Sequence, residues 1–449
     1  MKVFLSMISY VYGMRIVYLL LWLLLYGSLE PMAQGTALIQ RELEQSPILK
    51  DHFFGFSLYD LEQNRFLAGV NEDKYFTPAS NTKIFTLFAS LKNIGDSIPG
   101  IHFVERGDSL LFWGSGDPTF LHPKLDSRKV YDFLAHSDKK LYYVGEELME
   151  EPFYRHGWAI EDYDEYYQPE IRTFPVYGNV ATFRNIRNRL TASPAYFQPY
   201  IVRDQTIGDN NRVRIHRKFD ENIFLINNAK IPNNYVSEKP FKYSDELFVR
   251  LLQDTLHKPV ELIRYAKPAH VDTLFSTATR DVLREMMLVS DNFLAEQLML
   301  IAAKNRYDKF NTATLRKDMA SLYYAFFMDQ IDLYDSSGLS SYNKVTPRSL
   351  VELLLLIEQE VPEVDELRYL FPAGGVEGTL KATYRLDAGN PFVWAKTGTI
   401  KSVYCQSGYI QTRSGRKLVF SFLNNNFLGT AAPVRREVAR IMTYIRENY

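Results

Sequence analysis

A serine and a lysine three residues apart form the first pair in this chain that could act together as nucleophile and base. Ser80 and Lys83 lie in the run Thr-Pro-Ala-Ser-Asn-Thr-Lys, which opens an apolar, helix-like stretch that ends near Asn93. Residues three apart in a helix lie on one face, one turn apart. A lysine there can take the serine's proton and make the alcohol a nucleophile. The alternative roles are a helix cap for Ser80 and an exposed helix position for Lys83.

The role of base requires Lys83 to be neutral near neutral pH. Burial and a neighbouring cation both lower the pKa of a lysine. The candidate cation is Lys396, in the later run Lys-Thr-Gly. The hypothesis therefore places both lysines in one site.

A second motif, Ser290-Asp291-Asn292, stands directly before another apolar helical run, from Phe293 to Ala303. Ser290 could relay a proton between Lys83 and a leaving amine, and the amide of Asn292 could hold a substrate backbone. The alternative is that Ser290 or Asp291 only caps the helix.

A third motif, Lys396-Thr397-Gly398, lies in the strand-like run 392–400. Glycine lets a substrate backbone approach a strand closely, and Lys396 and Thr397 can bind a carboxylate. The backbone N–H groups of Ser80 and Thr399 are the candidate donors of an oxyanion hole. The alternative is an edge strand with a bulge.

The elements around these motifs predict an α+β fold. An antiparallel sheet is expected to carry helices on its faces, with three C-terminal strands joined in part by the turn Arg413-Ser414-Gly415. The expected strands cover 53–59, 65–70, 392–400, 404–412 and 416–424, and the expected helices cover 80–93, 279–287, 292–303, 313–330, 349–360 and 433–449.

A large insertion separates the first two motifs. Positions 80 and 290 are 210 residues apart, far more than a loop needs. Between about 95 and 268 the chain is rich in Gly, Pro, Asn, Asp and Tyr, and its strand-like runs are short. We therefore predict a catalytic domain made of 34–94 and 269–449, with a mostly-β insertion at 95–268.

The first 33 residues have the pattern of an export signal. Lys2 and Arg15 supply positive charge, an apolar stretch follows from Ile16, and cleavage is predicted after Ala33. The alternative is a membrane anchor, but the run from Ile16 to Leu29 is 14 residues long, short of the ~20 that span a bilayer.

Composition and missing motifs argue against several other classes of protein and site. A formal net charge of -1 and the lack of a basic stripe argue against nucleic-acid binding. Cys405 is the single cysteine, so an intramolecular disulfide is impossible. The eight histidines all lie at or before His270, without a G-x-S-x-G serine or an H-E-x-x-H pair. The proposed chemistry needs neither a metal nor a cofactor.

The three motifs, in this order, are typical of acyl-serine enzymes that react with penicillins. With these motifs the chain resembles the S13 peptidases, the D-alanyl-D-alanine carboxypeptidases often called the penicillin-binding protein 4 type. Besides the blocks of Ser80 and Lys396, the resemblance rests on Gly114–Thr119, Asp335–Ser340, Gly374–Leu380 and Ser407–Tyr409.

The resemblance implies a penicillin-binding (β-lactamase/transpeptidase-like) domain with an insertion. It also implies an exported, periplasmic serine D-Ala-D-Ala carboxypeptidase, with endopeptidase action on cross-links as a further possibility. Peptidoglycan stem peptides would be the substrate, β-lactams would be covalent inhibitors, and Ser80 would carry the acyl group. Asp162 matches a family aspartate that helps recognise the peptide side chain, although the following residues Tyr166–Pro169 depart from the family pattern.

Two alternatives keep the same fold. A serine β-lactamase would use the same nucleophile but needs a dedicated base for fast deacylation, and the sequence offers no clear candidate. A non-catalytic cell-wall-binding protein is expected to lose motif residues, and none is lost. The sequence leaves the oligomeric state open.

Overall fold

The structure is a computed structural model that describes residues 30–145, 149–208 and 211–449. Most of the predicted signal, 1–33, lies outside the described residues. The first described helix, α2 (Glu30–Glu44), includes the predicted cleavage point after Ala33. Within the described ranges, every helix is too short or too polar to cross a membrane.

A five-stranded antiparallel sheet is the centre of the catalytic part, with strand order β14-β15-β16-β1-β2. The strands lie close to the predicted ranges. Because β1 pairs with β16, the two ends of the chain meet in the middle of the sheet. The bounds are β1 Phe53–Asp60, β2 Arg65–Val70, β14 Val393–Ile400, β15 Val403–Gln411 and β16 Lys417–Asn425.

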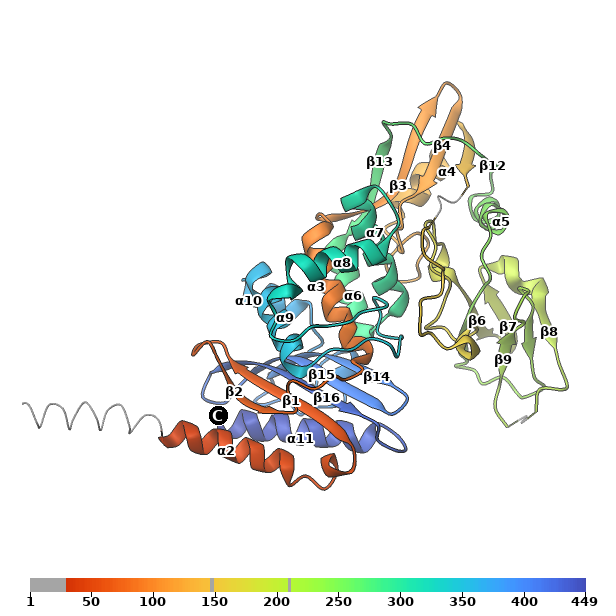
Figure 1. The fold of residues 1–449 in the computed structure, drawn as a ribbon. Helices are drawn as coiled ribbons and strands as arrows, with labels where there is room; N and C mark the ends of the chain where they lie inside the picture. The colour runs from red at the N-terminus through yellow and green to blue at the C-terminus, as the bar shows by residue number, and fades with distance from the viewer. Residues whose placement is uncertain (1–29, 146–148, 209–210) are drawn as a thin grey trace, which may run out of the picture.

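Both faces of this sheet are buried, as the alternation along β16 illustrates. Phe420 and Phe422 point to one hydrophobic core, whereas Val419 and Leu423 point to the other. The terminal helices α2 and α11 (Ala432–Asn448) cover the first face, and the remaining helices of this part cover the second (Figure 1). These are α3 Lys83–Asn93, α6 Thr279–Val289, α7 Asn292–Tyr307, α8 Thr312–Leu322, α9 Pro347–Glu360 and α10 Val364–Tyr369.

The helix predicted over 313–330 is wrong at its C-terminal end, because α8 stops at Leu322. Tyr323 leaves the helical region with φ −125° and ψ −46°. The bend buries the ring of Tyr324 edge-on against Phe85, while Phe326 stays 83% exposed. Tertiary packing on α3 therefore overrides a continuous helical pattern.

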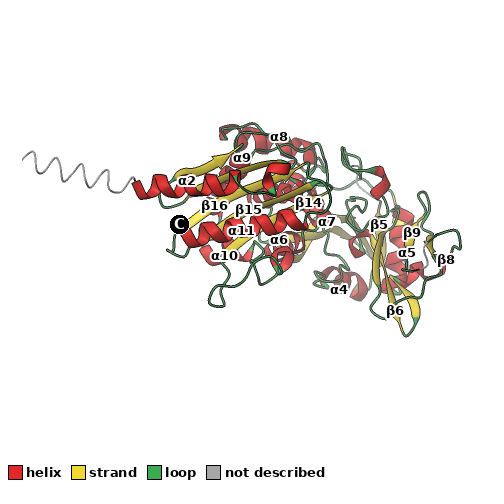
Figure 2. Cartoon of the chain, turned by 90° about the horizontal axis from the view of Figure 1, so that it is seen from below, coloured by secondary structure: helices red, strands yellow, loops and turns green. Residues whose placement is uncertain are grey.

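The inserted part extends to one side of the catalytic part (Figure 2). It contains a five-stranded sheet of order β12-β5-β4-β3-β13 and two three-stranded sheets, β11-β6-β7 and β8-β10-β9. Its strands are β3 Ser97–Arg106, β4 Ser109–Gly114, β5 Lys140–Val144, β6 Val180–Ile186, β7 Arg189–Ser193, β8 Ile201–Arg203, β9 Ile215–Arg217, β10 Phe224–Ile226, β11 Val236–Pro240, β12 Val260–Ile263 and β13 Asp272–Ala278.

Among its described residues this part also has two α-helices, α4 (Lys129–His136) and α5 (Asp245–Leu256). The sequence did not predict α4. Strand β13 begins after position 268, where the insertion was expected to end, yet it pairs with β3. The chain thus returns to the catalytic part only at α6, after closing the edge of the inserted sheet.

Candidate active site

Ser80 lies in a short 3-10 helix, Ala79–Thr82, that leads into α3. Two glycines let other segments approach it closely. A Cβ on Gly398 of β14 would stand 2.9 Å from the backbone nitrogen of Ser80, and one on Gly338 would overlap the carbonyl of Ala79. Ala79 itself has a positive φ of 46°, a strained backbone conformation that is typical of functional sites.

Lys83 is fully buried at the start of α3, and its Nζ has three polar contacts. It lies 3.0 Å from Ser80 Oγ, 2.7 Å from Asn292 Oδ1 and 2.6 Å from the main-chain oxygen of Ser337. The pair predicted from S-x-x-K is therefore in direct contact, and two further groups hold the amine in place.

Burial lowers the pKa of Lys83 to about 8, against the opposing effect of Asp335, Asp291 and Glu296. Of the two expected causes, burial is the leading one. A neutral amine has two N–H donors and one lone pair. With the donors on Asn292 and Ser337, the lone pair is left for the hydroxyl of Ser80.

In the Ser-Asp-Asn motif, one residue caps a helix and the other two contact lysines of the candidate active site. Asp291 is the N-cap of α7, and its carboxylate accepts a hydrogen bond from the backbone of Leu294 at 3.0 Å. Ser290 ends α6 with a positive φ of 63°, and its Oγ lies 2.7 Å from Lys396 Nζ. Helix capping thus accounts for Asp291, whereas Ser290 contacts Lys396 and Asn292 contacts Lys83.

Lys396 is fully buried on β14, the edge strand of the sheet. Its Nζ also donates to the carbonyl of Thr397 at 2.6 Å. Burial, and then the charge of Lys83, lower the pKa of Lys396. An arriving carboxylate would favour the charged form again. The hydroxyl of Thr397 donates to Thr379, and Thr399 is exposed at the end of the strand.

Asp162 is connected to the site through Tyr167. It lies in the short helix Ile160–Asp162 of the inserted part and interacts with the hydroxyl of Tyr167. Burial and, after it, Asp162 raise the pKa of that hydroxyl. The carbonyl of Tyr167 in turn accepts a hydrogen bond from Asn292 Nδ2 at 3.0 Å.

Sequence reasoning missed the carbonyls of Ser337 and Tyr167 and the carboxylate of Glu296. A main-chain carbonyl has no side-chain signal. Glu296 did have one, since it is an acidic residue within the apolar run Phe293–Ala303, four positions after Asn292. Its carboxylate accepts the backbone N–H groups of Ser336 and Ser337 at 2.8 and 2.9 Å.

The sequence model of the D-Ala-D-Ala carboxypeptidase 3 (S13) family matches residues 36–448. The chain belongs to this family. It is therefore a peptidase of the D-Ala-D-Ala carboxypeptidase type, as the resemblance implied.

Individual relatives agree with the family assignment. The D-alanyl-D-alanine carboxypeptidase DacB of Haemophilus influenzae is 24% identical over 424 residues, which cover 84% of this chain and 86% of the relative. A carboxypeptidase of Mycobacterium tuberculosis is 35% identical over 155 residues, 32% of each chain.

Solved structures confirm the predicted fold class. The crystal structure of penicillin-binding protein 4 from H. influenzae matches with a TM-score of 0.74 at 20% identity, covering 92% of this S13 peptidase and 99% of that protein. A predatory endopeptidase of Bdellovibrio bacteriovorus matches with a TM-score of 0.52 at 13% identity, covering 87% and 94%. Likeness at these identities establishes the fold.

Proposed function

We propose that this S13 peptidase removes the terminal D-Ala of peptidoglycan stem peptides through an acyl-enzyme on Ser80. The observation that carries the proposal is the contact between Lys83 Nζ and Ser80 Oγ at 3.0 Å. Both other contacts of that amine are acceptors, and its pKa is lowered to about 8. The arrangement suits a neutral amine that accepts the serine proton.

In the first step, Ser80 Oγ attacks the carbonyl carbon between the two D-Ala residues, and its proton passes to Lys83. The C–N bond then breaks, and the proton held by Lys83 passes to the leaving amine through Ser290, which contacts Lys396. Water next attacks the ester on Ser80 and gives up one proton to Lys83; the C–O bond breaks, and that proton passes to the serine oxygen. The backbone N–H groups of Ser80 and Thr399 would stabilise the oxyanion.

The substrate assignment rests on the groups beside the nucleophile. Lys396 and Thr397 offer a cation and a hydroxyl to the C-terminal carboxylate. One solved structure of the H. influenzae protein holds a β-lactam, which supports β-lactams as inhibitors here. Action on the cell wall requires export, so the signal at 1–33 and a periplasmic location belong to this proposal.

Mass spectrometry after penicillin treatment tests the proposal. The wild type is expected to gain the mass of one penicillin on Ser80, and a Ser80→Ala variant is expected to gain none. An unmodified wild type would contradict an acyl-serine enzyme and would favour a non-catalytic wall-binding protein.

The lifetime of the adduct separates the peptidase from the β-lactamase alternative. An adduct that persists for many minutes supports the peptidase, whereas rapid turnover supports the β-lactamase. Muropeptide products then distinguish loss of a terminal D-Ala from cleavage of a cross-link, the endopeptidase reaction.

A further inference from the structure

The Ser337 carbonyl on Lys83 belongs to a loop, residues 335–340, that we call the catalytic loop. Asp335 organises this loop from within. Its carboxylate accepts hydrogen bonds from the backbone of Gly338 at 2.9 Å, the backbone of Ser340 at 2.8 Å and the hydroxyl of Ser337 at 3.0 Å. Asp335 is 1% exposed, so these bonds are not in competition with water.

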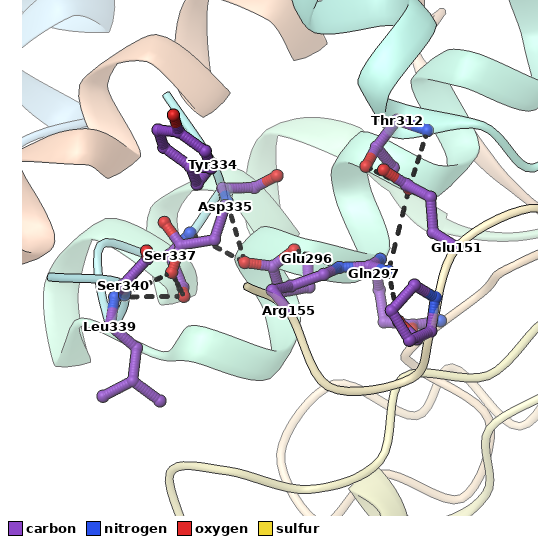
Figure 3. A network of polar contacts seen from close by, with 12 residues as sticks. Glu151, Arg155, Glu296, Gln297, Thr312, Tyr334, Asp335, Ser337, Leu339 and Ser340 are labelled. Atoms are coloured by element: carbon purple, nitrogen blue, oxygen red, sulfur yellow. Dashed lines mark hydrogen bonds and ion pairs between the residues drawn. The ribbon is translucent and has the colours of Figure 1, made fainter. Parts of the chain in front are cut away.

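Glu296 holds the same loop from the side of α7. One oxygen of its fully buried carboxylate accepts the N–H groups of Ser336 and Ser337. Because Glu296 and Asn292 are four residues apart on one helix, they lie on the same face. One helix face therefore positions both acceptors of Lys83, Asn292 directly and Ser337 through Glu296. Figure 3 shows Glu296 between Arg155 and the catalytic loop.

A segment of the inserted part, residues 151–158, completes the arrangement, and we call it the bracing segment. Arg155 Nε lies 3.2 Å from the second oxygen of Glu296, and the two side chains are 2% and 0% exposed. Trp158 Nε1 donates to Asp335 Oδ2 at 2.9 Å. The carbonyl of His156 accepts a hydrogen bond from Ser340 Oγ at 2.7 Å.

The bracing segment is itself fixed at both ends. Glu151 lies 3.1 Å from Arg316 and accepts the backbone N–H of Thr312, the first residue of α8, at 2.9 Å. At the other end, a Cβ on Gly157 would stand 2.5 Å from Ser340 Oγ, so only glycine lets the segment lie this close to the catalytic loop.

We propose that the bracing segment positions the base of the reaction: Arg155 acts through Glu296, and Trp158 through Asp335, to hold the Ser337 carbonyl on Lys83. These are positioning residues, since none of them touches Ser80. The inserted part is then required for acylation, beyond any part it has in binding the cell wall. This inference rests on the proposed role of Lys83 as base.

The charges around Lys83 give this role a signature in the pH profile. The charges of Asp335, Asp291 and Glu296 raise the pKa of Lys83, while burial, the leading effect, lowers it. The neighbouring Lys396 has a lowered pKa of its own. Removing the charge of Glu296 should therefore lower the pKa of Lys83. Loss of general stability would not move that pKa in this way.

The test uses Glu296→Gln in the full chain, with acylation by a fluorescent penicillin followed from about pH 6 to 10. We expect the maximal acylation rate to fall about tenfold or more and the pH midpoint of its rise to move to lower pH. Glu437→Gln is the matched control, because Glu437 is a 10% exposed carboxylate paired with Arg440 at 2.9 Å on the opposite face of the sheet.

Trp158→Phe is a second variant, which tests the proposal even if Glu296→Gln does not fold. It removes one N–H donor and keeps an aromatic ring. We expect the maximal acylation rate to fall about fivefold, with an unchanged dissociation constant for the non-covalent penicillin complex. Both variants should melt as a single folded species.

Three results would overturn the inference: wild-type acylation rates in folded variants, an equal fall in Glu437→Gln, or a fall in Glu296→Gln without a shift of the midpoint. A wild-type protein that forms no adduct on Ser80 would instead overturn the proposed function. The two failures are therefore distinguishable.

Discussion

The Nζ of Lys83 and the main-chain oxygen of Ser337 lie 2.6 Å apart. This contact joins the start of α3 to the catalytic loop, 254 positions later in the chain. It occupies one donor of the amine, and Asn292 occupies another. The direction of the lone pair toward Ser80 is thus fixed by groups that have no part in the covalent chemistry.

Acylation should depend on pH through Lys83. The amine accepts a proton only when it is neutral, and burial lowers its pKa to about 8. The acylation rate is therefore expected to be low near pH 6 and to rise with a midpoint near pH 8. Stopped-flow measurements with a penicillin that does not titrate in this range, alongside the melting temperature, check this. A flat profile in a folded protein would show that Lys83 is not the base.

Gly338→Ala should disrupt the site. The new methyl would overlap the carbonyl of Ala79, and Gly338 has a positive φ of 83° that alanine rarely adopts. We expect at least a hundredfold loss of acylation, because the turn that holds Ser80 must move.

Gly389→Ala is the matched control for this change. Gly389 has nearly the same φ, 84°, but nothing lies within 4 Å of its added methyl. Its cost should be the conformational strain alone, about 1 kcal/mol of unfolding free energy, with acylation unchanged. Equal losses of acylation in the two variants would refute the importance of the contact with Ala79.

The sequence could predict the parts of this site that have a side-chain signature. Ser80, Lys83, Asn292 and Lys396 lie in motifs whose order is informative, and the flanking elements are strongly periodic. The carbonyl of Ser337 could not be predicted, because every residue has one. This carbonyl contacts Lys83 because Asp335 holds the catalytic loop in place, and the conformation of that loop depends on tertiary contacts.

The contacts that the inserted part makes could not be predicted from local sequence patterns. Strand β13 pairs with β3 across about 170 residues of sequence, and no local pattern specifies such a partner. The ion pair of Arg155 with Glu296 is likewise non-local. This ion pair and the hydrogen bond of Trp158 to Asp335 join the inserted part to α7 and the catalytic loop, and no local sequence pattern indicates them.

Lys396→Met should reduce the preference for a free C-terminus. The wild type is expected to cleave an acyl-D-Ala-D-Ala acid much faster than its C-terminal amide, because Lys396 and Thr397 meet the carboxylate. The variant should lose about tenfold or more in kcat/KM for the acid and far less for the amide. The amide serves as the internal control. An equal loss for both peptides would assign Lys396 to the chemistry of Ser290 and not to carboxylate binding.

Two substitutions of Asp291 should distinguish its role as a helix cap from the effect of its charge on Lys83. Its carboxylate caps α7 through Leu294 and raises the pKa of Lys83. Asp291→Asn keeps a good cap but removes the charge, so stability should change by only a few tenths of a kcal/mol while the acylation midpoint moves to lower pH. Asp291→Ala should shift the midpoint in the same direction and also lose about 1 kcal/mol of unfolding free energy.

Urea unfolding and the pH profile of acylation, measured on both variants, give these two quantities independently. If the midpoint stays at its wild-type value in both variants, the charge of Asp291 does not act on Lys83. If Asp291→Asn is as unstable as Asp291→Ala, the residue contributes through its charge at the N-terminus of α7 and not through the cap hydrogen bond.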